Sequence, residues 1–501
     1  MPKPLGRSNG GCWTCRIRHR KCDEASPLCK ECTDRHIECH GYGTEPEWMK
    51  DPPKLRAELQ RIKHAVKQNF RRTRKSQAAS VRASKILADS SASGWNEATE
   101  SAHEGSEFRE AELIMYYLDY IFPLQYAYYA DKPAQGGRGW LFWLLYKKGP
   151  LRHAAFTLSA LHQHTISQSK TEEMESELIR HHTNAMQELR QVLSRCEMEG
   201  FDSHPEYRVE FLTCGTFLIS FEVFQGGTSN WESHLKALVA VASQIDLQSI
   251  GAVTDPLIST RPGAGFQRIV NAATRFHMSQ LLWFDLLSCI STGESPKLPY
   301  QRWLSHEDID ISCVMGCQNW AMLALGDVAS LEAQGAEPNP RAMRRRVADI
   351  RKRIEDGIGY LGVQEKSTAA IASQSVTRVF ATAILVQLRA ILVNVGEPSE
   401  IIHEAVAEVI DALQKVPKGV PIRGMPWPIC VAGAMADPEQ QSFFESLIEE
   451  VLETSGAGFT NCDTVQRILK ESWKDQNQFA VQGIPTWRQA MSRLGICALL
   501  V

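Results

Sequence analysis

Six cysteines within the first 39 residues of this 501-residue chain follow one spacing that is used twice. In each half two residues separate the first cysteine from the second, and six separate the second from the third, in the order Cys12, Cys15, Cys22 and then Cys29, Cys32, Cys39. A two-residue gap lets two thiolates converge on one tetrahedral zinc ion at zinc–sulfur distances of about 2.3 Å. A segment this short has no hydrophobic core of its own, so we expect metal binding to supply its folding free energy.

The number of cysteines constrains how the metal is held. Two tetrahedral zinc ions need eight ligand positions, whereas six cysteines supply only six. Six cysteines fill all eight ligand positions if two of the thiolates each bridge both ions. The pseudo-symmetry of the two halves predicts that these two are Cys12 and Cys29. Every ligand position is then filled by sulfur, and none is open for the water molecule that a catalytic zinc needs. The sequence therefore predicts two structural zinc ions per chain.

The N-terminal residues and the apolar runs of the chain indicate the compartment in which the protein acts. Residues 1–11 contain no apolar stretch of the kind found in a secretory signal. The most apolar runs, 140–146 and 379–386, are far shorter than the roughly 20 residues that a membrane-spanning helix needs. We therefore expect an intracellular protein without a membrane partner, whose 14 cysteines do not form a disulfide framework.

The net charge of −3 conceals a strong asymmetry along the chain. Residues 1–90 carry 20 Lys and Arg against 10 Asp and Glu, which leaves 35 basic and 48 acidic residues for positions 91–501. A basic N-terminal part joined to an acidic remainder indicates a polyanionic partner for the N-terminal part alone.

Charge also distinguishes the two halves of the cysteine segment. In the second half the two basic residues are outnumbered by three acidic ones, Glu31, Asp34 and Glu38. The first half can therefore lie against DNA phosphates without repulsion, and its long basic side chains can reach guanine N7 and O6 in the major groove. We expect the DNA-binding residues to be Arg16, Arg18, His19, Arg20 and Lys21, all between the second and third cysteines.

The segment from Cys12 to Cys39 resembles the fungal zinc binuclear cluster family of transcription factors. The family pattern has a proline between the halves, matched by Pro27, and a basic first half that reads Cys-Arg-x-basic-basic-x-Lys-Cys, as residues 15–22 do here. The resemblance implies a two-zinc, six-thiolate cluster and recognition of CGG triplets in double-stranded DNA through the two central basic positions. These positions are Arg18 and His19, and the histidine departs from the usual Lys or Arg, so its base contact is expected to be weaker or different.

Residues 46–75 read as a proline-punctuated link that leads into a basic helix. The run 51–53, Asp-Pro-Pro, is a helix start. Leu55, Leu59, Ile62 and Val66 follow at the spacing of a coiled-coil seam. The family often dimerises through such a helix, so one interpretation is a homodimer on DNA, and the other is a helix that packs on its own chain. The basic run Arg71, Arg72, Arg74 and Lys75 fits either a nuclear localisation signal or a phosphate-binding patch.

Beyond this helix, residues 76–106 have few large apolar side chains and read as a disordered linker. From residue 107 to residue 501 the apolar residues recur at helical spacing, which predicts an all-α domain. This region resembles the fungal-specific transcription factor domain in four stretches, 116–129, 139–162, 222–235 and 427–433. We therefore expect four regions: a zinc cluster domain (1–45), a link with a coiled-coil-like helix (46–75), a linker (76–106) and a helical regulatory domain (107–501).

These observations predict a small zinc-stabilised DNA-binding module joined by a linker to a large all-α domain. We expect a nuclear transcription regulator that binds double-stranded DNA, contacts the transcription machinery and controls a metabolic or biosynthetic gene set. The alternative is an enzyme or effector-binding domain tethered to a DNA-binding head. The chain has no nucleophile elbow, no zinc-protease motif and no phosphate-binding loop, so we do not expect an enzyme.

Overall fold

The computed structural model divides the chain into two compact units, Met1–His103 and Glu104–Val501, and each is described by itself. The structure describes residues 10–18, 20, 22–25, 28–33, 37–44, 46, 49, 51, 54–55, 58, 61–62, 97–130, 137–200, 205–228, 230–245, 264–306, 308–334, 340–362, 367–394, 396–454, 460–476 and 486–501.

The small unit is built on two short helices, α1 (Trp13–Ile17) and α2 (Lys30–Thr33). Each begins directly after the first cysteine of its half, so the two-residue gap to the next cysteine is one helical turn. Cys12 is the N-cap of α1, and its sulfur accepts a hydrogen bond from the backbone nitrogen of Cys15 at 3.4 Å. Trp13 closes the module by donating its backbone N–H to the carbonyl of Gly41 at 3.0 Å. The described core of this unit therefore consists of sulfur and only two isoleucines, Ile37 and Ile62.

From α4 onward the described elements are all helical, as the sequence pattern predicts. They are α4 (Glu97–Tyr116), the π-helical turn η2 (Tyr117–Ile121), α5 (Phe122–Gln125), α6 (Gly139–Tyr146), α7 (Pro150–Ile166), α8 (Glu172–Glu199), α9 (Pro205–Val223), α10 (Trp231–Ala242), α11 (Ala264–Thr292), α12 (Tyr300–Leu304), α13 (Ser312–Met315), α14 (Asn319–Ala333), α15 (Pro340–Tyr360), α16 (Thr368–Asn394), α17 (Glu400–Gln414), the 3₁₀ turn η6 (Ile422–Gly424), α18 (Pro426–Ala434), α19 (Pro438–Thr454), α20 (Cys462–Gln476) and α21 (Trp487–Leu494).

The core of the large unit is formed around helices that are buried on all sides. Every residue of α18 is buried, and so is every residue of α9 from Val209 to Val223. A helix without an exposed face has to be surrounded by other helices. The same holds for α16, which by length and composition alone could cross a membrane, but 72% of its most apolar stretch is buried inside the unit. This burial is what a core helix of a folded domain shows.

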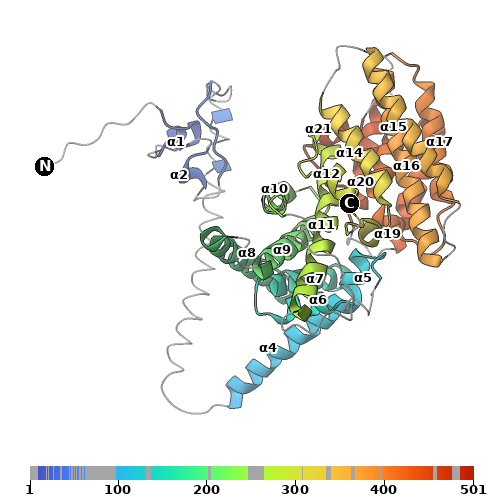
Figure 1. Cartoon of the computed structure of the whole chain (residues 1–501). Coiled ribbons are helices and arrows are strands. Elements are labelled where there is room, and N and C mark those ends of the chain that lie inside the picture. The colour runs from blue at the N-terminus through green and yellow to red at the C-terminus, as the bar shows by residue number, and fades with distance from the viewer. Residues whose placement is uncertain are drawn as a thin grey trace. The chain divides into compact units, whose positions relative to one another are not determined.

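Neighbouring helices pack in two groups (Figure 1). The long helix α7 packs on α8 and α9, and α16 packs on α17, α15 and α18. The last residues of the chain join distant segments: Leu499 donates its N–H to Gly227, and its carbonyl accepts from Asn461 at 2.7 Å. Trp231 donates its indole N–H to the carbonyl of Cys497 at 2.9 Å. These bonds join the middle of the unit to its end, and one hydrophobic core extends from Tyr117 to Leu500.

The helix α4 begins at Glu97, inside the segment 76–106 that the sequence predicts to be a disordered linker. The run from 97 to 104, Glu-Ala-Thr-Glu-Ser-Ala-His-Glu, contains several strong helix formers. A shortage of large apolar residues argues against a hydrophobic core but not against a helix, which explains the difference. The remainder of that segment, 76–96, lies outside the described residues.

Candidate metal centre and DNA interface

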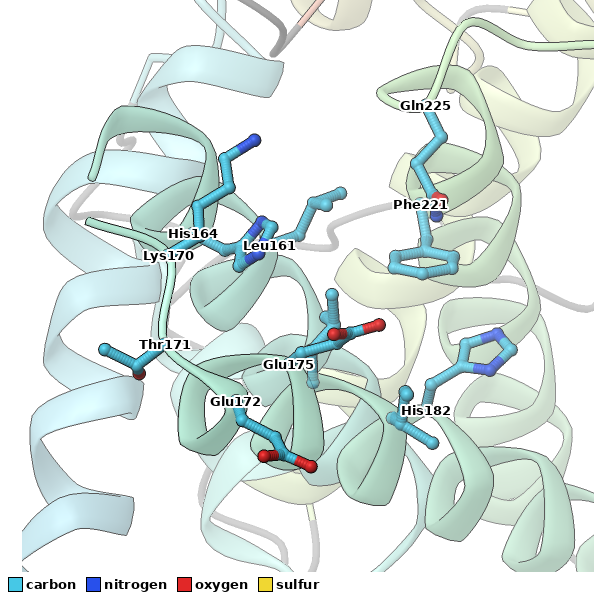
Figure 2. A pocket seen from close by; sticks show the side chains of 11 residues that line it. Leu161, His164, Lys170, Thr171, Glu172, Glu175, His182, Phe221 and Gln225 are labelled. Carbon is cyan, nitrogen blue, oxygen red and sulfur yellow. The ribbon is translucent and has the colours of Figure 1, made fainter. Parts of the chain in front are cut away.

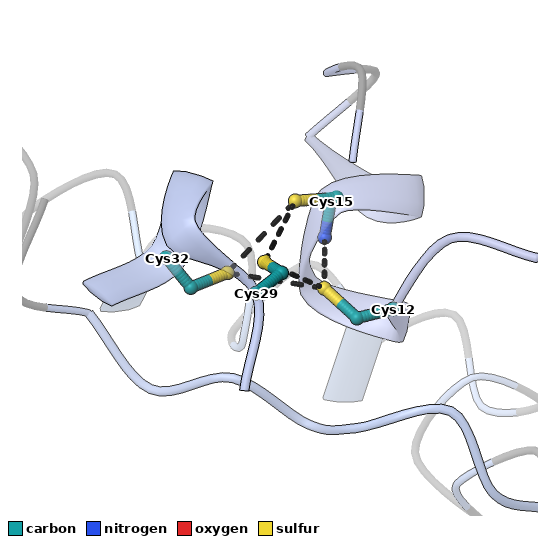
Figure 3. Close-up of side chains that lie close together, drawn as sticks. All are labelled: Cys12, Cys15, Cys29 and Cys32. Carbon is teal, nitrogen blue, oxygen red and sulfur yellow. Dashed lines mark hydrogen bonds between the residues drawn. The ribbon is translucent and has the colours of Figure 1, made fainter. Parts of the chain in front are cut away.

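Four cysteine sulfurs of the small unit meet at the spacing of a tetrahedral metal site (Figure 3). The Cys12 sulfur lies 3.6 Å from that of Cys29 and 3.8 Å from that of Cys32. The Cys15 sulfur lies 3.7 Å from that of Cys29 and 3.9 Å from that of Cys32. Zinc–sulfur bonds of about 2.3 Å in a tetrahedron place the sulfurs about 3.8 Å apart, which matches these distances. The residues present therefore fit a zinc ion.

The two remaining cysteines adjoin the same cluster beside Cys12 and Cys29. The Cys39 sulfur lies 4.0 Å from that of Cys29. The Cys22 sulfur accepts a hydrogen bond from the backbone nitrogen of Cys12 at 3.5 Å and lies within 4.8 Å of the Cys29 sulfur. Asp23 also lies near this second group, but its carboxylate caps α2 by accepting from the backbone nitrogen of Lys30 at 2.9 Å. Cys29 thus lies close to cysteines from both halves of the segment, Cys22 and Cys39.

The environment of the sulfurs favours a bound cation. Cys12, Cys15, Cys29 and Cys32 are all fully buried. Burial raises the pKa of the Cys12 thiol well above its ordinary value and that of Cys15 to about 12. Thiolates packed this closely need a positive charge among them to compensate for lost solvation and mutual repulsion.

A polar network that the sequence analysis missed ties the cluster to the segment that follows it. The Thr14 hydroxyl, on α1, lies 2.8 Å from His40 Nδ1, and His40 Nε2 lies 3.3 Å from the Glu58 carboxylate. Arg61 then donates to Glu58 and to Glu38 at 2.6 Å each. These residues are not arranged in a motif, so only the folded chain reveals that they meet.

Packing on the cysteine cluster determines where one residue of the expected coiled-coil seam, Ile62, lies. Ile62 is 2% exposed and packs with the buried cysteines and Ile37. Leu55 is half-buried, whereas Leu59 and Val66 lie outside the described residues. The helix start therefore packs on its own chain at Ile62, which is one of the two interpretations that the sequence left open.

The predicted DNA-contacting residues occupy different environments. Arg16 and Arg20 are exposed, and the Arg16 guanidinium lies over the Trp13 ring at 4.4 Å from its centroid. The Arg18 side chain is only 9% exposed, and its guanidinium lies 3.7 Å from the Glu31 carboxylate, at the start of α2. A base contact by Arg18 would require this ion pair to open. His19 and Lys21, together with Pro27 and the basic run 71–75, lie outside the described residues.

The large unit carries a wide surface hollow between α7, α8 and the end of α9 (Figure 2). Its volume is about 680 Å³, and Leu161, Leu178, Ile179 and Phe221 supply its apolar lining. The groups around it have both signs of charge, with Lys170 on one side and the carboxylates of Glu172 and Glu175 on the other (Figure 2). This mixture indicates no particular ligand.

Comparison with known proteins gives the two units separate matches. Residues 10–48 match the fungal Zn(2)-Cys(6) binuclear cluster domain, and residues 112–501 match the fungal specific transcription factor domain. The first match contains all six cysteines of the cluster. The second spans nearly all of the large unit, so the two matches together account for most of the chain.

Several curated relatives align along most of their own length. The pestheic acid cluster transcriptional regulator 3 of Pestalotiopsis fici is 27% identical over 89% of this chain and 91% of its own. The trichothecene biosynthesis transcription regulator TRI10 of Trichoderma arundinaceum is 26% identical over 78% of this chain and 98% of its own. The ustiloxin B cluster transcription factor ustR of Aspergillus flavus is 23% identical over 99% of both chains.

No solved structure gives a significant match to this chain. The family matches confirm the prediction of a zinc cluster module followed by a large helical domain. The chain therefore belongs to the family of fungal transcription factors that join a Zn(2)-Cys(6) binuclear cluster domain to a fungal specific transcription factor domain.

Proposed function

We propose that this protein is a sequence-specific DNA-binding transcription regulator that acts in the nucleus on a metabolic or biosynthetic gene set. The observation that carries the proposal is the tetrahedral spacing of four buried sulfurs directly beside α1, a helix that exposes Arg16. The names of the relatives, which refer to pestheic acid, trichothecene and ustiloxin B clusters or biosynthesis, favour a biosynthetic gene cluster as the target.

The metal site is proposed to hold two zinc ions through all six cysteines, with Cys12 and Cys29 each bridging both ions. The short distances from the Cys29 sulfur to that of Cys15, in the first half, and to that of Cys39, in the second half, support this assignment. Zinc supplies the positive charge and the cross-links that a core of two isoleucines cannot provide. The cysteines then hold α1 and α2 at a fixed distance, and Arg16 and Arg20, after Cys15, remain exposed.

DNA recognition is proposed to divide between two kinds of contact. Arg16, Arg20 and Lys21 neutralise phosphates, which gives affinity and salt dependence without sequence preference. Arg18 and His19 face the bases of a CGG-like triplet, since arginine binds guanine N7 and O6 with two hydrogen bonds. Arg18 has to leave Glu31 to do so, and the proposed major-groove contact offers it two guanine acceptors in exchange.

The segments between the cluster domain and the helical domain are proposed to serve assembly and transport. The proposed domain boundaries are 1–45, 46–75, 76–106 and 107–501. The helix within 46–75 contributes to a homodimer on DNA through whichever of its apolar residues do not pack on the cluster. The run 71–75 serves as a nuclear localisation signal, and the helical domain contacts the transcription machinery.

Selection of binding sites from a random duplex pool tests the proposal. The intact chain, loaded with zinc, is incubated with the pool, and bound duplexes are sequenced over several rounds. Enrichment of CGG-containing duplexes by the wild type, and its loss in Arg18→Ala, is the expected result. Recovery of unenriched duplexes by the wild type would mean that the head binds DNA without reading it.

A further inference from the structure

The two sulfurs that attach α1 to the cluster leave one rotation of this helix undetermined. A short rigid element that is held at two points, here Cys12 and Cys15, can still turn about the line that joins them. Arg16 lies on α1 and Arg18 is its C-cap, so both change direction with that turn. A side chain that recognises a ligand has to be held to within about 0.5 Å of its working position. Base contacts therefore need a third attachment point for α1.

Thr14 makes the third attachment, to the segment 38–43. It is fully buried, and its hydroxyl accepts a hydrogen bond from the backbone N–H of His40 at 2.9 Å. The same hydroxyl lies 2.8 Å from His40 Nδ1 and 2.9 Å from the carbonyl oxygen of Glu38. Trp13 donates both its backbone and its indole N–H to carbonyls of this segment, at 3.0 Å each. The direction of α1 therefore depends on where the segment 38–43 lies.

Two residues from further along the chain hold that segment in turn. His40 Nε2 lies 3.3 Å from the Glu58 carboxylate, so the neutral tautomer with its proton on Nε2 donates to Glu58 while Nδ1 accepts from Thr14. The Arg61 guanidinium donates two hydrogen bonds to Glu58, at 2.6 and 2.9 Å, and one to the Glu38 carboxylate at 2.6 Å. Arg61 also lowers the pKa of the Glu58 carboxyl group, which is therefore ionised at neutral pH. These five residues form a closed ring of polar contacts.

The ring differs from an ordinary surface ion pair in three respects. His40 and Glu58 are largely buried, with side chains 14% and 16% exposed. Arg61 binds the Glu58 carboxylate through two nitrogens, which fixes the mutual orientation of the two groups. Ile62, the next residue, packs against the buried cysteines and so anchors this end of the ring to the cluster. The groups of such a network act together, and the removal of one disturbs the others.

We propose that Arg61 and Glu58 are positioning residues for DNA recognition, which fix the direction of α1 and hence of Arg18. Their effect passes through His40 and Thr14, and neither residue has to touch DNA. The segment 46–75 then belongs in part to the DNA-reading apparatus and is more than a connection between domains. This inference rests on the proposed function. The function is tested by sequence discrimination in the wild type, whereas the ring is tested by the change of that discrimination in variants.

Anisotropy titrations of the intact, zinc-loaded chain with two duplexes test the proposal. One duplex contains the site that the wild type selects, and in the other the central triplet is replaced. The ratio of the two dissociation constants measures discrimination. Arg61→Gln opens the ring, and we expect it to lower discrimination about fivefold or more, because one bidentate contact between arginine and guanine contributes about 5- to 150-fold. Arg61→Lys keeps the charge but loses the two-point contact, so an intermediate ratio is expected.

Lys54→Gln is the matched control for the lost positive charge. Lys54 lies in the same segment, its side chain is 71% exposed, and it pairs with Asp51 outside the ring. The loss of a solvated positive charge weakens binding to both duplexes equally, because phosphates carry no sequence information. We therefore expect unchanged discrimination in Lys54→Gln.

A second variant acts at the opposite side of the ring. Thr14→Val keeps the branched shape of the buried side chain but removes the hydroxyl, and it should lower discrimination to the same degree as Arg61→Gln. The double variant should be little worse than either single one, since both break the same ring. Elemental analysis should give the wild-type zinc content in all variants.

Three results would overturn the proposal. The first is wild-type discrimination in Arg61→Gln, whatever its overall affinity, which would mean that α1 is oriented without the ring. The second is loss of zinc from Arg61→Gln and Thr14→Val, which would make the ring a support of the metal site alone. The third is full additivity in the double variant, which would separate the two effects. Equal affinity of the wild type for both duplexes would instead overturn the proposed function, and this inference with it.

Discussion

The Arg18 guanidinium lies 3.7 Å from the Glu31 carboxylate, and this ion pair joins the basic half of the cysteine module to its acidic half. Arg18 is 9% exposed and one of its terminal nitrogens, Nη1, is buried without a partner among the described residues. The residue expected to read DNA bases is thus held inward by the half that is expected not to touch DNA. In the proposed mode of recognition, DNA binding and the internal ion pair compete for the Arg18 side chain.

Replacing Glu31 tests this competition. Glu31→Gln removes the charge that holds Arg18, so we expect tighter binding to a CGG-containing duplex by about two- to fivefold, as for loss of an ion pair worth up to about 1 kcal/mol. Fluorescence anisotropy with a labelled duplex measures the effect. Glu24→Gln, in the loop after Cys22, is the control for a simple change in net charge. Equal gains in both variants would show that long-range charge, and not the Arg18 pair, sets the affinity.

Unequal effects of the cysteines follow from the proposed bridging. Cys12→Ser or Cys29→Ser removes a ligand from both ions, whereas Cys15→Ser removes one from a single ion. We therefore expect the first two variants to retain less than one zinc ion per chain and the third to retain about one. Elemental analysis after gel filtration gives the count. Identical zinc loss in all three variants would contradict a bridging role.

The burial of Ile62 gives a third prediction. Ile62→Ala removes a side chain packed on the buried cysteines, so we expect the small unit to lose about 2–4 kcal/mol of stability and to release zinc faster to a chelator. Leu55→Ala, at a half-buried position, should change zinc release much less. If Ile62→Ala leaves zinc release unchanged but prevents pairing on a duplex with two half-sites, as measured by ultracentrifugation, Ile62 belongs to a dimer seam.

A fourth prediction concerns acidic pH and the large unit. His277 is 1% exposed, and burial lowers its pKa to about 3, whereas an unfolded histidine has a pKa of about 6.5. Because the folded pKa lies below the unfolded one, the unfolded chain takes up the proton first as the pH falls. His277 therefore does not reduce the free energy of unfolding of the large unit above pH 6.5, and reduces it progressively as the pH falls toward 3. Between pH 7.5 and 5.5 this group alone should cost about 1.4 kcal/mol.

Comparison with a neutral substitute isolates that contribution, because other buried histidines, such as His181, also have lowered pKa values. Urea unfolding of wild type and His277→Gln is measured at both pH values. The wild type should lose about 1.4 kcal/mol more than the variant on acidification. Parallel losses in the two proteins would mean that His277 is protonated without unfolding.

The sequence was sufficient to predict the parts of this protein whose residues carry a fixed spacing. The doubled cysteine pattern predicts a metal-binding module because each two-residue gap lets two thiolates bind one zinc ion. In the structure the sulfurs of Cys12, Cys15, Cys29 and Cys32 do lie close together. The helical periodicity likewise predicts the all-α unit. Both predictions depend on residues that are close together in the sequence, and the structure agrees with both.

Contacts between segments could not be predicted in this way. In the sequence, Glu31 is one of three acidic residues that disfavour DNA contact by the second half of the cysteine segment. In the structure its carboxylate pairs with Arg18. Ile62 fits a seam by spacing, yet it lies on the cysteines. A cavity lined by Arg423 in the large unit is assembled from residues as distant as Gln125 and Asn461, and no spacing relates them. These features depend on tertiary packing, which a pattern along one segment does not contain.

The central claim is that a zinc cluster holds α1 and the basic residues after it so that Arg18 and His19 read a specific DNA sequence. The most direct test is an anisotropy titration of the intact chain with a CGG-containing duplex and with one in which the triplet is replaced, before zinc removal, after it, and after zinc is restored. We expect the replaced triplet to weaken binding by about 100-fold or more, and zinc removal to abolish the difference reversibly. Equal affinity for both duplexes, or sequence preference that persists without zinc, would contradict the account.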